Sequence, residues 1–228
     1  MVGIIVAMDK ELAGWLDAVA VREIVRVADK AFYLGTCEGT ELVIAQSGVG
    51  KVNAAITAAL MCSRYQVDYV VNTGVAGGVF PSRTGDLAVA TRVLYADVDV
   101  TAIDPVPYGQ MAGEKLYALA DPALLERAAR ILGRLGMPHR FGTIASADRF
   151  VTDPAVLSPI RAHTADVVAV DMESMAVAHA AEVFGVPFVV IRGISDVIDA
   201  PGQVDGYRDV AAAICANTAA FVRAFLRG

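Results

Sequence analysis

The chain has few cysteines, and they do not form a recognisable framework. Its 228 residues include three, Cys37, Cys62 and Cys215. Their odd number and wide separation argue against a disulfide framework, and the absence of C-x-x-C spacing argues against a thiolate metal site. We therefore expect three small core residues in a reducing compartment.

Charge is also scarce, and positive charge is not in excess. Charged residues make up 19% of the sequence and hydrophobic residues 56%, and the formal net charge is −6. Such a surface is not expected to attract nucleic acid or an anionic membrane. Because the hydrophobic share exceeds what one small globule needs to bury, the composition predicts self-association.

Long apolar runs are missing as well. No uninterrupted stretch approaches the roughly 18 residues of a membrane span, and the apolar run at residues 2–8 is too short for a signal-peptide core. The sequence contains no internal repeat, low-complexity tract or linker. We expect one cytoplasmic domain over residues 1–228.

What the sequence does contain is an alternation of short apolar segments with helical patterns. Strands are expected at residues 3–8, 32–37, 41–46, 69–72, 87–95, 140–146, 167–170 and 187–194, and helices at 10–19, 51–65, 122–135, 172–184 and 209–226. This alternation predicts an α/β fold with a central, largely parallel (mixed) twisted sheet flanked by helices. Ligands bind at the carboxyl ends of the strands of such sheets. That rule nominates the segments 8–11, 73–78, 146–151, 171–173 and 192–196.

Some patterns resemble cofactor or metal sites without completing the motif. Gly48 and Gly50 follow a strand and open a helix, but Asn53 stands where a dinucleotide fingerprint needs a third glycine or alanine. The three histidines are far apart, and the aspartates of residues 97–104 lack the glycine and glutamate of a calcium loop. We predict neither a metal nor an organic cofactor.

Five segments near the expected strand ends carry a family pattern. They read Gly3-Ile-Ile-Val-Ala-Met8-Asp9-Lys10-Glu11, Ser47-Gly-Val-Gly-Lys-Val52, Asn72-Thr-Gly-Val-Ala-Gly-Gly78, Val170-Asp-Met-Glu173 and Arg192-Gly-Ile-Ser-Asp196. In order and spacing they resemble the 5′-methylthioadenosine/S-adenosylhomocysteine nucleosidases of the purine nucleoside phosphorylase superfamily, over nearly the whole chain. The resemblance implies a nucleoside phosphorylase-like fold, an adenine nucleoside substrate and hydrolysis without a cofactor.

The resemblance also implies roles for four charged side chains. Cleavage of a purine N-glycosidic bond passes through an oxocarbenium-like sugar, so the site must protonate the base, stabilise positive charge and deliver a water. Asp196 is expected to protonate purine N7, Glu11 to activate the water, and Glu173 to bind the ribose hydroxyls. Arg192 lies in an apolar strand and needs a buried anion, for which Glu11 and the water site are the expected partners. Without the resemblance, the three acids would be read as carboxylates at helix starts.

Further residues are expected to bind the substrate. The resemblance implies that Phe150 stacks on adenine, that the Val151 backbone hydrogen-bonds the base edge, and that Met8 and Met172 lie under the ribose. The remaining expected binding residues are Val75, Ala76, Gly77 and Ser195.

Two departures from the family pattern leave the preference for the 5′-substituent open. Val75 stands where the family often has a hydroxyl residue. The lid region, residues 201–207, lacks the usual phenylalanine-rich sequence and has Val204 where an aromatic is expected.

Other functions stay open at this point. A sister nucleosidase such as a futalosine hydrolase would share the scaffold. A phosphorylase would need arginines around a phosphate, where this sequence has Glu11. A non-catalytic nucleoside-binding protein would lose the acids. The resemblance further implies a homodimer in which the loop of residues 100–113 reaches the neighbouring subunit's 5′-pocket. Apolar Ile103 and Met111 in that loop suit a partly buried contact.

Overall fold

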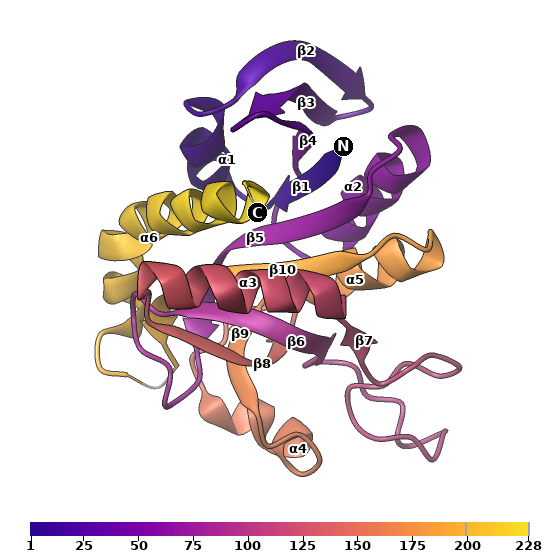
Figure 1. Ribbon diagram of the computed structural model, residues 1–228. Helices are drawn as coiled ribbons and strands as arrows, with labels where there is room; N and C mark the ends of the chain where they lie inside the picture. The colour runs from indigo at the N-terminus through magenta and orange to yellow at the C-terminus, as the bar shows by residue number, and fades with distance from the viewer. Residues whose placement is uncertain (199, 228) are drawn as a thin grey trace.

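A computed structural model of the chain describes residues 1–198 and 200–227. These residues form a mixed sheet with helices on both faces (Figure 1), so the predicted α/β class is confirmed. The strands are β1 (Val2–Val6), β2 (Ala20–Val27), β3 (Lys30–Cys37), β4 (Thr40–Gln46), β5 (Tyr69–Gly78), β6 (Leu87–Tyr95), β7 (Ala118–Leu119), β8 (His139–Ser146), β9 (Val167–Asp171) and β10 (Phe188–Val197). The helices are α1 (Asp9–Leu16), α2 (Lys51–Arg64), α3 (Pro122–Leu135), α4 (Ser158–Arg161), α5 (Ser174–Val183) and α6 (Gln203–Leu226), with a short 3₁₀ helix η1 (Pro154–Leu157).

Part of the sheet closes on itself. Strands β4, β1, β5 and β10 run parallel to one another, while β6, β8 and β9 form a second parallel set. The two sets are joined by antiparallel pairing of β10 with β6 and of β5 with β9. Because Gly77 in β5 pairs with Val170 in β9, the carboxyl ends of both sets meet at one place.

Two apolar layers hold the helices against the sheet. On one face α2 and α5 contribute side chains such as Met61 and Val177, and on the other α1, α3 and α6 contribute Trp15, Ile131 and Phe221. Each of these large side chains stabilises the fold by about 1.5–3 kcal/mol when fully buried. Helix α6 is long and apolar enough to cross a membrane by length and composition, but it packs on β10 and β5.

The structure corrects several predicted boundaries. The glycine-rich segment 73–78, expected to be a loop, continues strand β5, and the closing helix begins at Gln203 rather than at residue 209. Strands β2 and β7 and the short helices η1 and α4 were not predicted. Strand β2 is exposed along most of its length, so it lacks the alternation of buried and exposed residues that marks a strand.

Candidate active site

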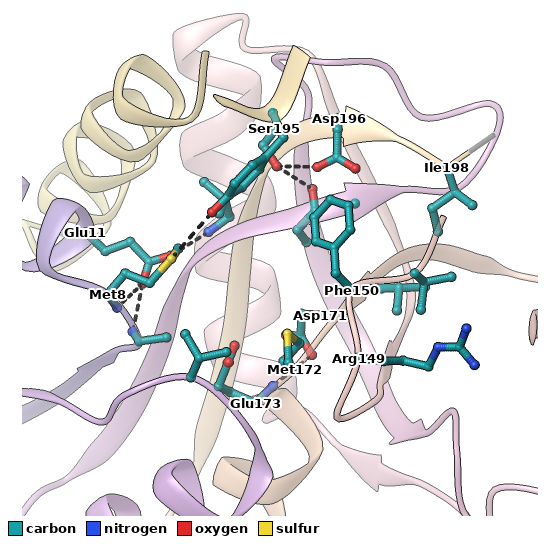
Figure 2. Close-up of a pocket in the computed structure, with 18 residues that line it drawn as sticks. Met8, Glu11, Arg149, Phe150, Asp171, Met172, Glu173, Ser195, Asp196 and Ile198 are labelled. Atoms are coloured by element: carbon teal, nitrogen blue, oxygen red, sulfur yellow. Dashed lines mark hydrogen bonds between the residues drawn. The ribbon is translucent and has the colours of Figure 1, made fainter. Parts of the chain in front are cut away.

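A cavity of about 140 Å³ opens where the two sets of strand ends meet (Figure 2). Every residue predicted to act in catalysis or binding lines this cavity except Arg192, which is completely buried in β10. The cavity therefore brings together residues from all five of the sequence segments nominated from strand ends, including Phe150 and Val151 after β8. Lining residues that sequence reasoning did not select are Ala7, Val49, Arg149, Val170, Asp171, Ile198 and Tyr207.

Glu11 is fixed in the first turn of α1, directly after β1. Its Oε2 accepts hydrogen bonds from the N–H groups of Ala7 (2.7 Å) and Met8 (3.0 Å), and its Oε1 accepts one from the N–H of Val75 (3.0 Å). The bond from Met8 belongs to a capping box, so Glu11 also performs the helix-start role that its position suggests. Three donors hold this carboxylate in a single orientation and stabilise its negative charge.

Arg192 lies among acidic groups from β9 and the start of α5. Its Nη2 is 2.8 Å from Asp171 Oδ2, 3.3 Å from Glu173 Oε2 and 2.8 Å from the Asn72 side-chain oxygen. Within the described residues its ion pairs are with Asp171 and Glu173, so the prediction that Glu11 is its partner was wrong. The reason is that sheet closure brings the end of β9, and with it Asp171, against β10.

Glu173 connects this cluster to the turn before α2. Its Oε1 accepts a hydrogen bond from the N–H of Gly50 (3.0 Å), so this N–H of the Gly48–Gly50 turn faces a carboxylate. Although Glu173 precedes α5, its side chain makes no capping hydrogen bond. Within residues 1–198 and 200–227, no group of three or more histidine, cysteine, aspartate or glutamate side chains is arranged to hold a metal ion.

Two carboxyl groups pair with one guanidinium in this cluster, and the Glu11 carboxylate acts on it from a greater distance. Burial raises the pKa of Glu173 to about 7, against the lowering effect of Arg192, and the carboxylates of Asp171 and Glu11 add to the increase. Burial acts to lower the pKa of Arg192, but Asp171, Glu173 and Glu11 outweigh it and the pKa is raised. Arg192 is therefore charged, while Glu173 changes between its neutral and ionised forms near neutral pH.

One remaining polar atom of Arg192, Nη1, lies near Gly74. The Nε and Nη1 atoms of Arg192 are buried and have no hydrogen-bond partner within the described part of the chain. A Cβ atom on Gly74 would lie 2.3 Å from Glu11 Oε1 and 2.7 Å from Arg192 Nη1. Because both atoms lie close to that one point but Arg192 and Glu11, both among the residues that the structure describes, form no direct ion pair, the two atoms are roughly 4–5 Å apart, a separation that one bridging water can span.

Asp196 stands at the opposite end of the cavity, after a register shift in the pairing of β10 with β5. Its Oδ1 accepts a hydrogen bond from the Ser195 hydroxyl (2.6 Å), and its Oδ2 accepts one from Gln203 Nε2 (2.7 Å). Helix α6 begins after Gly202, so Asp196 does not cap it and the alternative of an N-cap is wrong. Figure 2 shows Phe150 next to Asp196, with Glu11 and Glu173 across the cavity.

An aromatic side chain from α6 covers the cavity beside Phe150. The rings of Tyr207 and Phe150 meet edge to face with centroids 5.5 Å apart, and the Tyr207 hydroxyl donates to Met8 Sδ (3.6 Å) and accepts from Lys10 Nζ (2.8 Å). Val204, where an aromatic was expected, is exposed. The spacing of Gln203 and Tyr207, four residues apart, would have indicated one helix face had the helix been started at residue 203.

Comparison with known proteins identifies the family of the chain. The phosphorylase superfamily profile matches residues 1–227. The 5′-methylthioadenosine/S-adenosylhomocysteine nucleosidase of Geobacillus thermodenitrificans is 41% identical over 196 residues, which are 85% of this chain and 83% of that protein.

Solved structures of such nucleosidases are also similar. The enzyme from Streptococcus pneumoniae, solved with a transition-state inhibitor, has a TM-score of 0.91 and 33% identity, covering 99% of this chain and 98% of its own. The enzyme from Helicobacter pylori, solved as an aspartate-to-asparagine variant with 5′-methylthioadenosine in its active site, has a TM-score of 0.91 and 28% identity, covering 98% and 96%. The chain therefore belongs to the phosphorylase superfamily and, within it, to the 5′-methylthioadenosine/S-adenosylhomocysteine nucleosidases.

Proposed function

We propose that the protein hydrolyses the N-glycosidic bond of 5′-methylthioadenosine and S-adenosylhomocysteine, and of related 5′-substituted adenosines such as 5′-deoxyadenosine. The products are adenine and the 5′-substituted ribose. The observation that carries the proposal is the arrangement of one cavity with an acid at one end, Asp196, and Glu11 and Glu173 at the other. The names of the relatives give the substrate class.

The end of the cavity at Asp196 suits a 6-aminopurine. One carboxyl oxygen of Asp196 accepts a hydrogen bond from N6, and the other delivers a proton to N7 so that adenine leaves as a neutral base. Phe150 offers an aromatic face, and the Val151 backbone offers hydrogen bonds to the base edge. A 6-oxopurine presents acceptors at both positions, so we expect a strong preference for adenine nucleosides.

The opposite end suits the ribose and the attacking water. A water held between Arg192 Nη1 and Glu11 Oε1 attacks C1′ as the bond from C1′ to N9 breaks, and Glu11 takes its proton. Ionised Glu173 accepts hydrogen bonds from the ribose hydroxyls and stabilises the positive charge that develops on the sugar. Gly74 matters here because the absence of a side chain leaves the space between Glu11 and Arg192 open.

The charge of the site favours water over phosphate as the nucleophile. Phosphate needs cationic donors that are free to bind it. The buried guanidinium of Arg192 is already neutralised by Asp171 and Glu173, and Glu11 adds a further carboxylate next to the proposed water position. A phosphate dianion would be repelled by these groups.

The test is to incubate the purified protein with a panel of 5′-substituted adenosines and 6-oxopurine nucleosides, with and without phosphate. We expect the rate of adenine release to be the same with and without phosphate. The products should be free adenine and a free reducing sugar. Sugar 1-phosphate as the main product would refute hydrolysis. Release of hypoxanthine from inosine as fast as adenine from adenosine would refute the assignment of Asp196.

We also propose a homodimer that completes the cavity. The loop of residues 100–113 projects from the body of the domain (Figure 1), and its Ile103 is 85% exposed. Val49 and Phe150 at the cavity and Val52 on α2 are also exposed apolar side chains, and an apolar surface of this kind is typical of a protein interface. Light scattering at a concentration that gives full activity should yield twice the chain mass of 23.9 kDa. A monomer mass with full activity would refute the dimer.

The cellular setting is a further proposal. Cys37 and Cys215 are buried, Cys62 is half-buried, and all three are free thiols, which suits the reducing cytoplasm. Cell fractionation tests this location. The proposed sugar product retains the methylthio group, which suits a role in methionine salvage. The test is whether cells that lack the protein lose growth on 5′-methylthioadenosine as the sulfur source.

A further inference from the structure

Gln203 is a buried polar residue at the base end of the cavity that the proposed mechanism does not use. Its side chain is 8% exposed, although the residues around it, 201–210, are exposed or half-buried. Its Nε2 donates to Asp196 Oδ2 at 2.7 Å and to the Val151 carbonyl oxygen at 3.0 Å. The first turn of α6 thus places one amide group against two residues that line the base end of the cavity.

The hydrogen bonds of Gln203 match those of a 6-aminopurine. A primary amide nitrogen carries two N–H donors in a plane, and so does the exocyclic amine of adenine. The two acceptors that this amide joins, Asp196 and Val151, are the acceptors proposed above for N6 and the base edge. Two nitrogens cannot occupy the same point between these acceptors, so the base and the amide exclude each other.

We infer that Gln203 holds the position of the 6-amino group before the base enters, and that the nucleoside displaces it. The inference rests on the proposed function, because it takes Asp196 and Val151 as the base-binding groups. The amide satisfies both buried acceptors, which would otherwise be left without a donor. Gln203 is therefore an affinity-determining residue that competes with the substrate within the same chain.

The local structure allows the amide to leave without disturbing the core. Gln203 is the first residue of α6 and follows Gly202, whose φ of +72° marks the turn into the helix. A side chain added at Gly206 in the same turn would meet nothing within 4 Å, so that side of the turn faces open space. The fully buried apolar residues of α6 begin further along, at Ala211 and Ile214, after the partly buried Tyr207. We infer that rotation of the Gln203 side chain, with exchange of its hydrogen bonds, opens the base site.

Competition of this kind weakens the binding of adenine: the apparent Kd is the intrinsic Kd divided by the fraction of molecules in which the base site is open. Two hydrogen bonds, one of them to a carboxylate, correspond to a roughly 10- to 100-fold preference for the occupied position. We therefore expect Gln203→Ala to lower the Kd of adenine by about 10-fold or more. The KM for 5′-methylthioadenosine should fall with it, while kcat stays within about 3-fold, because the amide is absent from the reacting complex.

The experiment is calorimetric titration of adenine into the wild type, Gln203→Ala, Gln203→Leu and the control Val204→Ala. Leucine keeps the volume of glutamine but donates no hydrogen bond, and Val204 is an exposed neighbour in the same turn. Tighter binding in both Gln203 variants and unchanged binding in the control is the expected result. Equal or weaker binding in the Gln203 variants overturns the inference, because a displaced group cannot assist binding.

A second measurement uses the wild type and does not depend on how the variants fold. The side-chain amide NMR signals of Gln203, assigned by their absence in Gln203→Ala, should shift when adenine is added. Unchanged signals at saturating adenine overturn the inference while leaving the proposed function intact. If adenine fails to bind any form and the nucleoside panel gives no adenine, the proposed function itself has failed.

Discussion

Replacement of Gly74 by alanine tests the proposed water position most directly. The new Cβ would lie 2.3 Å from Glu11 Oε1 and 2.7 Å from Arg192 Nη1, whereas ordinary contacts begin at 3.4 Å. Glu11 must therefore move by about 1 Å, and a misplacement of that size can cost about 100-fold in rate. This corresponds to about 2.7 kcal/mol of transition-state stabilisation. We expect kcat for 5′-methylthioadenosine to fall by at least that factor, while the Kd of adenine, which binds near Asp196, stays unchanged.

A matched control separates this effect from backbone strain. Gly74 has a φ of +151° and Gly85 a φ of +95°, so alanine is strained at both positions, but a Cβ at Gly85 would meet nothing within 4 Å. Strain of this kind costs about 1–3 kcal/mol. Gly85→Ala should therefore lower the melting temperature and keep its kcat. Normal turnover by Gly74→Ala, measured by adenine release in a coupled absorbance assay, would refute the idea that the water lies between Glu11 and Arg192.

Two further substitutions address the acids. Asp196→Asn should lower kcat by about 100- to 10,000-fold, because an amide cannot give up a proton to N7. Calorimetry should show that this variant still binds adenine. Near-normal turnover would contradict the assignment of Asp196 as the acid that protonates N7. For Glu173, whose pKa burial raises to about 7 from an ordinary 4.5, ionisation creates the form that accepts from the ribose, so kcat/KM should rise with pH through about 7. The folded protein binds this proton more tightly than the unfolded chain does. Its free energy of unfolding should therefore decrease as the pH rises from about 4.5 to 7. Glu173→Gln should lose both dependences in pH-rate and thermal-melt profiles, and an unchanged pH-rate profile would contradict the role of Glu173.

Strong local patterns made most of the fold predictable. The predicted helix at 122–135 matches α3, where Asp121 caps the start and accepts from the Leu124 N–H, and Gly136 ends the helix in a left-handed conformation. The closing helix was predicted to start late because its first turn is polar and contains Gly206. In that turn the buried residue is a glutamine, so hydrophobic periodicity has nothing to detect.

The candidate site was predictable where residues follow strand ends, and less so where long-range packing decides. Glu11, Glu173 and Asp196 stand next to apolar strands, and they meet in one cavity. The ion pair of Arg192 with Asp171 depends on how β9 pairs across the closed sheet, which no local pattern encodes. Gln203 was missed for a related reason, since its contacts are with residues that precede it by 7 and 52 positions.

The glycines of β5 lie where the two parallel sets of strands, joined by antiparallel pairing, share one site. The segment 73–78 was expected to lie beyond the end of a strand, but its backbone pairs with β10 on one side and β9 on the other. A Cβ on Gly78 would lie 2.7 Å from Ile194 Cγ2, whereas one on Gly77 would lie 3.3 Å from Asp196 Oδ2, so glycine at position 78 allows β10 to pack closely on β5 beside the cavity. If these strands lay further apart, Asp196 on β10 and Glu173 after β9 could not line one small cavity. The pairing of Gly77 and Gly78 with β9 therefore closes the sheet, and that closure brings Asp196 and Glu173 to one cavity.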